Sequence, residues 1–266
     1  MTISIITATF NSEKTLRSTF DSILMQTYKE YEVIVVDGNS KDNTINIIKE
    51  YEIKFNKRMR WISERDNGIY DAMNKGIAMA KGEIVGILNS DDFFYDDKVL
   101  EEINNGFINN NTECVFGNLV YVDANKTDVI LRIWKGSEYR EGRFKYGWVP
   151  AHPTFYVKRE CYLKYGNYDL SYQVSADFEL MLRFLAKHKI KSTYINRYFV
   201  RMRMGGESNS SVRNIIIGNQ NIMRAFKKND VKSTVFYPAF RLLPKVLQRV
   251  SIKCKNKINI KTKLKY

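Results

Sequence analysis

A cluster of oxygen-bearing side chains at residues 89–92 follows directly after the uncharged apolar run 84–88. Such a run predicts a strand buried on both faces of a sheet. Asp91 and Asp92 then stand at the carboxyl end of that strand, where open α/β sheets bind ligands. Two adjacent carboxylates repel each other unless a cation lies between them, and Mg²⁺ binds through one or two carboxylates together with substrate phosphates. The pair predicts a metal site, and an Asp pair that begins a turn or caps a helix is the alternative.

Three further strands are predicted at residues 3–9, 32–36 and 60–63, which are rich in β-branched and other apolar residues. Each is followed by polar residues, namely Thr9 and Asn11, Asp37, and residues 64–66. Because the carboxyl ends of parallel strands meet at one edge of a sheet, we expect these groups to face the same crevice as Asp91 and Asp92.

Apolar residues at helical spacing predict helices between these strands, at residues 16–26, 42–51 and 70–81. Strand and helix alternate four times within the first 92 residues. This pattern predicts an α/β fold with a Rossmann-like, mostly parallel sheet and helices on both faces. Beyond residue 92 the pattern changes to strands at 114–123 and 129–134 around a turn, and a helix follows at 212–228.

The turn after the first strand, Thr-Ala-Thr-Phe-Asn-Ser, contains no glycine. A dinucleotide site would need Gly-x-Gly-x-x-Gly there, and no P-loop sequence occurs in the chain. An acidic crevice without a glycine-rich loop indicates that phosphates are held through a metal ion.

The charge of the chain is concentrated at its end. Of 266 residues, 43 are Lys or Arg and 29 are Asp or Glu, which gives a net charge of +14. Residues 231–266 hold ten of the basic residues and no acidic one. We therefore expect a domain at 1–228 and a basic amphipathic extension at 229–266. This extension favours an anionic membrane surface as its partner, with a solvated tail as the alternative.

The three cysteines are odd in number and widely spaced, which fits neither a disulfide framework nor a zinc site and favours a reducing cytoplasm. The N-terminus has no positive charge before its apolar run, so it is not typical of a signal peptide. No stretch approaches the roughly 20 apolar residues that span a bilayer. These features predict a soluble or membrane-surface protein.

Four segments together resemble family 2 glycosyltransferases, which are inverting enzymes of the GT-A fold. They are Thr-Ala-Thr-Phe-Asn at 7–11, Val-Val-Asp-Gly-Asn-Ser-Lys-Asp-Asn-Thr at 35–44, Gly-Ile-Tyr-Asp-Ala-Met-Asn-Lys-Gly at 68–76 and Leu-Asn-Ser-Asp-Asp at 88–92. The likeness covers residues 2–223 and is closest to bacterial O-antigen, capsule and colanic-acid types. It implies a GT-A sheet with a small mixed sheet on the acceptor side.

The resemblance places Thr7, Thr9 and Asp37 around the base and ribose of a nucleotide, because a carboxylate accepts hydrogen bonds from uracil N–H or ribose hydroxyls. It places Asp66 at the uracil edge. An Asx-turn is the alternative for Asp37, and a turn before Asn67 is the alternative for Asp66.

The resemblance also implies donor contacts for Asn74 and Lys75, although many relatives carry Arg where this chain has Met73. Arg203 lies in a glycine-containing loop at 201–208 and is expected to reach the diphosphate. Such a loop would order over the donor and exclude water, and an ordinary glycine turn is the alternative.

The acidic segment corresponds to the metal motif of the family, with Asn89 in place of its first Asp. Asn89 is expected at the ribose, while Asp91 and then Asp92 are expected to bind Mg²⁺ or Mn²⁺.

The segment at 175–184 matches the catalytic-base segment of the family, where Glu-Asp usually precedes a helix. Ala176 replaces the Glu, and Asp177 is kept as the expected general base. A helix N-cap is the local alternative for Asp177. His152 is expected near the acceptor or the diphosphate, with a structural role as the alternative.

The predicted function is inverting transfer of a sugar from a nucleoside diphosphate sugar, by default UDP-hexose, to a lipid-diphosphate-linked glycan in surface polysaccharide biosynthesis. The predicted location is the inner face of the bacterial plasma membrane. Alternatives are a sugar-phosphate nucleotidyltransferase and a nucleic-acid-binding protein. No nucleic acid is expected, because the basic residues crowd into the tail instead of covering a folded face with aromatic residues.

Overall fold

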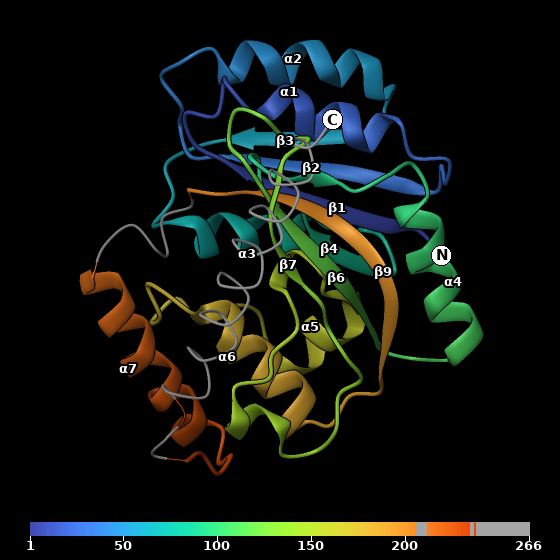
Figure 1. Cartoon of the computed structure of the whole chain (residues 1–266). Helices are drawn as coiled ribbons and strands as arrows, with labels where there is room; N and C mark the ends of the chain where they lie inside the picture. The colour runs from blue at the N-terminus through green and yellow to red at the C-terminus, as the bar shows by residue number, and fades with distance from the viewer. Residues whose placement is uncertain (206–211, 235–236, 238–266) are drawn as a thin grey trace, which may run out of the picture.

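The computed structural model describes residues 1–205, 212–234 and 237 (Figure 1). Its strands form one nine-stranded sheet with the order β3-β2-β1-β4-β8-β6-β9-β5, and β7 pairs with β6. Helices cover both faces of this sheet.

The first half of the sheet is parallel. Its strands are β1 (Ile3–Thr9), β2 (Tyr31–Asp37), β3 (Met59–Ser63) and β4 (Ile84–Ile87). The helices between them are α1 (Leu16–Leu24), α2 (Thr44–Phe55) and α3 (Ile69–Met79). The predicted alternation of strand and helix is therefore confirmed, with the strand ends of β1 and β2 in register at Thr9 and Asp37.

The second half of the sheet is mixed. Its strands are β5 (Phe93–Phe94), β6 (Cys114–Val122), β7 (Ile130–Trp134), β8 (Tyr156–Lys158) and β9 (Ser192–Arg203). Its helices are α4 (Val99–Asn110), α5 (Arg159–Tyr165), α6 (Ala176–Leu182), the π-helical turn Arg183–Lys187 and α7 (Val212–Lys228), with 3-10 turns at Arg143–Tyr146 and His152–Thr154. The small mixed sheet expected on the acceptor side is continuous with the parallel half, because β8 pairs antiparallel with both β4 and β6.

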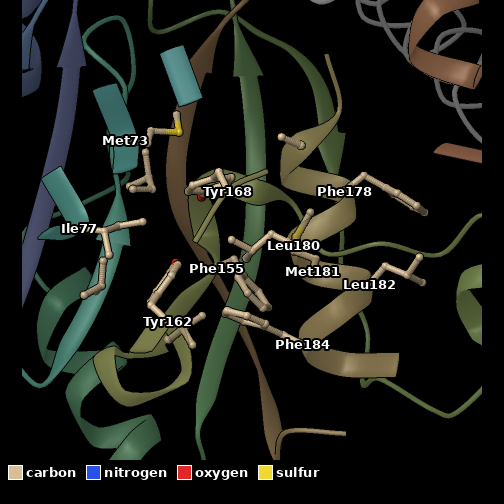
Figure 2. Packing of buried hydrophobic residues seen from close by; sticks show 14 of the residues in the cluster. Met73, Ile77, Phe155, Tyr162, Tyr168, Phe178, Leu180, Met181, Leu182 and Phe184 are labelled. Atoms are coloured by element: carbon tan, nitrogen blue, oxygen red, sulfur yellow. The ribbon is translucent and has the colours of Figure 1, made fainter. Parts of the chain in front are cut away.

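Two hydrophobic clusters occupy the two faces of the sheet. On β1, Ile3 and Ile5 pack with α1, α2 and α4, whereas Ile6 and Ala8 pack with α3, α5 and α6. This alternation follows the two-residue period of a strand. Figure 1 shows α1 and α2 on one side of β1–β3 and α3 on the other. Figure 2 shows the second cluster, with Tyr168 between Met73 of α3 and Leu180 of α6.

Packing of this cluster continues beyond α7. Asn229 is buried and donates to Glu179 Oε1 at 3.0 Å, and Tyr237 lies against Phe178 and Phe226. The expected domain boundary at residue 228 stays a prediction, and residues 238–266, with Cys254 and most of the basic extension, lie outside the described residues. Within the described part of the chain, no helix combines the length and apolar character needed to cross a membrane.

Candidate functional site

The acidic segment lies at the end of β4 and is held there by α1. Thr19 of α1 donates its hydroxyl to the carbonyl oxygens of Ser90 and Asp92, at 3.0 and 2.7 Å. Ser12, just before α1, hydrogen-bonds through its hydroxyl to the Ser90 hydroxyl at 2.8 Å. These bonds fix the segment as it leaves the sheet, because they satisfy backbone carbonyls that the strand no longer pairs.

Two oxygen atoms of this segment are buried and accept no hydrogen bond. They are Asn89 Oδ1 and Asp92 Oδ1. Asp92 is 0% exposed, and its other oxygen accepts a long hydrogen bond, 3.4 Å, from Asn89 Nδ2. Burial, and then the neighbouring charge of Asp91, raise the pKa of the Asp92 carboxyl well above its ordinary value. Buried acceptors without donors are costly, and a hard divalent cation is a partner that suits such oxygen ligands.

Asp91 differs from Asp92 in remaining partly exposed. Burial is the main cause that raises the pKa of Asp91. No group of three or more His, Cys, Asp or Glu side chains able to hold a metal occurs among the described residues. The donor set therefore fits Mg²⁺ or Mn²⁺ that takes its remaining ligands from substrate phosphates and water, and does not fit an all-protein cage.

Arg203, at the end of β9, reaches the same segment across the sheet. Its guanidinium donates to the Asp91 carbonyl and to Ser18 Oγ, the latter at 2.9 Å, and lies 4.8 Å from the centre of the Phe93 ring. The structure thus brings Arg203 to the backbone of Asp91, and its expected contact with the diphosphate stays a prediction. The sheet order explains the contact with Asp91, because β5 follows the acidic segment and pairs with β9.

Thr9 and Asp37 also meet, but both side chains are buried. The Asp37 carboxylate accepts hydrogen bonds from the hydroxyls of Thr9, Ser40 and Ser63 and from the Ser40 amide. This network ties together the ends of β1, β2 and β3, and the Asx-type contact to Ser40 is the local alternative weighed for Asp37. Thr7 is likewise buried, and its hydroxyl has no partner. Direct contact of these three side chains with a nucleotide stays a prediction.

The exposed surface beside this network is made by Phe10, Gly38 and Asp66. The Phe10 ring is 64% exposed. A Cβ on Gly38 would lie 2.7 Å from Asp66 Oδ2 and 3.2 Å from the Phe10 ring, so the absence of a side chain at Gly38 leaves room for both groups. An exposed ring next to a carboxylate suits a nucleobase, which has a π-face and N–H edges. Sequence reasoning missed Phe10, although its position directly after β1 was an available signal.

Asn74 and Lys75 have other partners. Asn74 donates to the Tyr168 carbonyl at 2.8 Å and accepts from the Tyr168 amide at 2.9 Å. Lys75 forms an ion pair with Glu64 at 2.8 Å and donates to the Arg65 carbonyl at 3.0 Å. Both polar atoms of the Asn74 amide are therefore occupied, and donor contacts by these two residues stay a prediction.

Asp177 lies in the first turn of α6, after Ser175, whose φ of 70° is left-handed. It accepts a hydrogen bond from the Tyr70 hydroxyl at 3.2 Å. The Tyr70 ring stacks on Tyr168 with 5.5 Å between ring centres, and the Tyr168 hydroxyl lies 2.7 Å from His152 Nε2. Burial lowers the pKa of His152, which opposes the effect of Asp177. Asp177 and His152 thus belong to one cluster, and sequence reasoning missed both tyrosines in it.

Tyr121 on β6 is influenced by the charges of both the acidic segment and Asp177. Burial is the main cause that raises the pKa of Tyr121 on β6, and the charges of Asp92 and Asp177 both raise it further. Tyr121 therefore lies within electrostatic range of both carboxylates.

Solved structures share this fold. S. aureus TarS 1-349 in complex with UDP matches with a TM-score of 0.64 and 17% identity, over 90% of this chain and 68% of that one. The mannosyltransferase PcManGT from Pyrobaculum calidifontis, in complex with GDP-Man and Mn²⁺, matches with a TM-score of 0.62 and 19% identity, over 90% of this chain and 67% of that one. The chain covers 43% of a longer S. aureus TarS. The fold is that of GT-A glycosyltransferases.

Sequence comparison then gives the family. The family model described as "Glycosyl transferase family 2" matches residues 4–162, and the chain belongs to this family. It is 29% identical over 210 residues to a PGL/p-HBAD biosynthesis glycosyltransferase of Mycobacterium bovis (strain BCG / Pasteur 1173P2). The matched region covers 79% of this chain and 80% of the relative. It is 28% identical over 214 residues to an uncharacterized glycosyltransferase of Methanocaldococcus jannaschii, over 78% of this chain and 72% of the relative.

Proposed function

We propose that this chain is an inverting, metal-dependent glycosyltransferase that moves a hexose from UDP to a hydroxyl of a lipid-diphosphate-linked glycan in surface polysaccharide biosynthesis. The observation that carries the proposal is the pair of buried, unpartnered oxygens on Asn89 and Asp92, beside the partly exposed Asp91. Family membership favours a glycosyltransferase over a nucleotidyltransferase or a nucleic-acid-binding protein.

At the donor end, Phe10 stacks on the base and Asp66 accepts a hydrogen bond from its N–H edge. The UDP complex of TarS supports a uridine nucleotide for this fold, whereas the GDP-Man complex of PcManGT shows that another base occurs in it. Within the crevice, Asp91 and Asp92 hold the divalent cation. When bound, that cation offsets the charge that develops on the leaving diphosphate.

At the acceptor end, Asp177 removes the proton from the attacking hydroxyl. The hydroxyl oxygen then forms a bond to the anomeric carbon while the bond from that carbon to the diphosphate oxygen breaks, and this single displacement inverts the configuration. Arg203 holds the acidic segment in place through the Asp91 carbonyl. The proton ends on the Asp177 carboxylate and is released to water after the product leaves.

The basic extension supports a location on the inner face of the bacterial plasma membrane. Anionic headgroups would attract its lysines and arginines, at about 1 kcal/mol for each residue close to the surface. The acceptor proposed here is anchored in that membrane, so both substrate and enzyme would be confined to one surface.

The decisive experiment measures UDP release by the purified chain from a panel of UDP-sugars, with Mn²⁺ and then with EDTA. We expect one donor to be hydrolysed in an EDTA-sensitive manner. Asp91→Ala should abolish this release and also the binding of Mn²⁺ in the presence of UDP, followed by the electron paramagnetic resonance of the ion. Asp97→Asn, at an exposed position outside the site, is the matched control. Absence of any metal-dependent UDP binding would refute the proposal.

A further inference from the structure

The orientation of Asp177 depends on a residue from another element. The Tyr70 hydroxyl, on α3, donates to Asp177 Oδ1 at 3.2 Å, although 107 residues separate the two in sequence. Among the described residues, no second hydrogen bond to the Asp177 carboxylate is formed. Tyr70 therefore fixes one carboxylate oxygen and leaves the other for a proton that comes from a substrate.

Tyr70 is itself held in place from two directions. Its ring stacks on Tyr168 at an interplanar angle of 26°. Asn74 hydrogen-bonds to both the carbonyl and the amide of Tyr168. It lies four residues after Tyr70, on the same face of α3. The Tyr168 hydroxyl hydrogen-bonds to His152 Nε2. Both rings are therefore fixed relative to the start of α6.

The Tyr70 phenol is suited to act as a permanent hydrogen-bond donor. Burial, and then the charge of Asp177, raise the pKa of the Tyr70 phenol well above its ordinary value. The phenol therefore keeps its proton at neutral pH.

We propose that Tyr70 is the positioning residue for the general base Asp177, and that Tyr168 and Asn74 form the support that holds Tyr70. This inference rests on the proposed function, because it takes Asp177 as the base. It assigns Asn74 to the support of the general base through Tyr168, in place of the contact with the nucleotide-sugar donor that was expected from sequence.

Tyr70→Phe tests this directly, because it keeps the stacked ring and removes only the hydroxyl group. We expect kcat for UDP-sugar hydrolysis to fall on the order of tenfold to a hundredfold, since small misplacements of a catalytic group have effects of this size. KM and Mn²⁺-dependent UDP binding should stay unchanged. Tyr172→Phe is the matched control, because the buried Tyr172 hydroxyl has no partner.

A double variant separates this inference from the proposed function. If Tyr70 acts through Asp177, adding Tyr70→Phe to Asp177→Asn should change the residual rate less than about twofold, because coupled residues are not additive. An equal loss with and without Asp177 would show a general structural role and overturn the inference. Unchanged kcat in Tyr70→Phe, with Asp177→Asn inactive, would also overturn it and leave the proposed function standing. An active Asp177→Asn enzyme would overturn the proposed function itself.

Thermal unfolding of each variant shows whether it folds. Tyr168→Leu gives a second route, because it removes the stacking surface and keeps the Tyr70 hydroxyl. It should lower kcat in the same direction without weakening UDP binding. Unchanged kcat in a folded Tyr168→Leu enzyme would overturn the proposed support.

Discussion

Removal of Glu179 should destabilise the protein strongly, because this carboxylate is the partner of a nearly buried arginine. Glu179 is 0% exposed, and Arg183, one turn later, has a side chain that is 11% exposed. The two groups form an ion pair with 3.1 Å between Arg183 Nη2 and Glu179 Oε2. Breaking a buried pair by removing one partner costs about 3–5 kcal/mol, because the other charge is left without compensation.

The surroundings of Arg183 place the expected cost at the lower end of that range. Its guanidinium also donates to the carbonyls of Tyr165, Gly166 and Asn167, and these bonds remain after the substitution. We therefore expect Glu179→Ala to lower the free energy of unfolding by about 3 kcal/mol. For a protein of this size, that loss corresponds to a fall in Tm of roughly 6–12 °C.

Calorimetry or circular dichroism measures the fall in Tm directly. Glu50→Ala is the control, because Glu50 forms solvent-exposed ion pairs with Arg17 and Lys54, and exposed pairs contribute little to stability. Glu179→Leu combined with Arg183→Met should recover most of the lost stability, since it removes both charges together. A Glu179→Ala variant no less stable than Glu50→Ala would refute this reasoning.

Three further variants test the donor surface and the contact of α7 with the loop before α6. Phe10→Ala should weaken Mn²⁺-dependent UDP binding roughly fivefold to 150-fold in calorimetric titration, since stacking on a base contributes about 1–3 kcal/mol, and it should barely change Tm because the ring is 64% exposed. Gly38→Ala should weaken the same binding because the added Cβ displaces Asp66; unaltered affinity would show that Asp66 does not contact the base. Asp169→Asn removes the partner of Lys228. Although burial opposes it, the Lys228 hydrogen bond and others lower the pKa of Asp169 to about 2. Asp169→Asn should therefore be less stable than wild type above pH 4, by at most about 1 kcal/mol because the pair is partly exposed. This difference should vanish as the pH falls through about 2, where Asp169 becomes protonated in the wild type.

Local sequence patterns predicted most of the fold. The uncharged runs and helical spacings identified β1 to β4 and α1 to α3 within a few residues, and α7 with the bounds that it has in the structure. The position of β8 and β9 in the sheet was not predictable in this way. Their pairing partners, β4 and β6, are far away in sequence, and no short pattern encodes such a pairing.

Candidate site residues could be named from the sequence where the residue type indicates a chemical role, and those roles stay predictions. Asp91 and Asp177 were identified because carboxylates at a strand end or in a known motif suggest metal binding or base catalysis. Phe10 and Tyr70 were missed because an aromatic residue is read first as core. Their roles depend on exposure and on contacts with distant elements, such as the 107 residues between Tyr70 and Asp177.

The two ends of the site differ in how their polar groups are satisfied, and this difference has a measurable consequence. The groups around Asp177 are hydrogen-bonded, whereas Asn89 Oδ1 and Asp92 Oδ1 lack donors. Each such buried acceptor costs about 1–3 kcal/mol. Asp92→Asn removes a buried charge and offers an amide that can donate to Asn89, so it should raise the free energy of unfolding in EDTA by about 1–2 kcal/mol.

The same variant should lose its response to ligand. Saturating Mn²⁺ with UDP, at about 100 times Kd, should stabilise the wild type by about 2.7 kcal/mol, or roughly 5–10 °C in Tm. Asp92→Asn should show a much smaller shift with Mn²⁺ and UDP and no change in its response to UDP alone. A variant that is less stable than wild type in EDTA, with the full shift retained, would show that the Asp92 charge serves the fold. A variant that is more stable than wild type in EDTA, and that has lost the shift with Mn²⁺ and UDP, would show that the chain keeps an unfavourable carboxylate because a cation requires it.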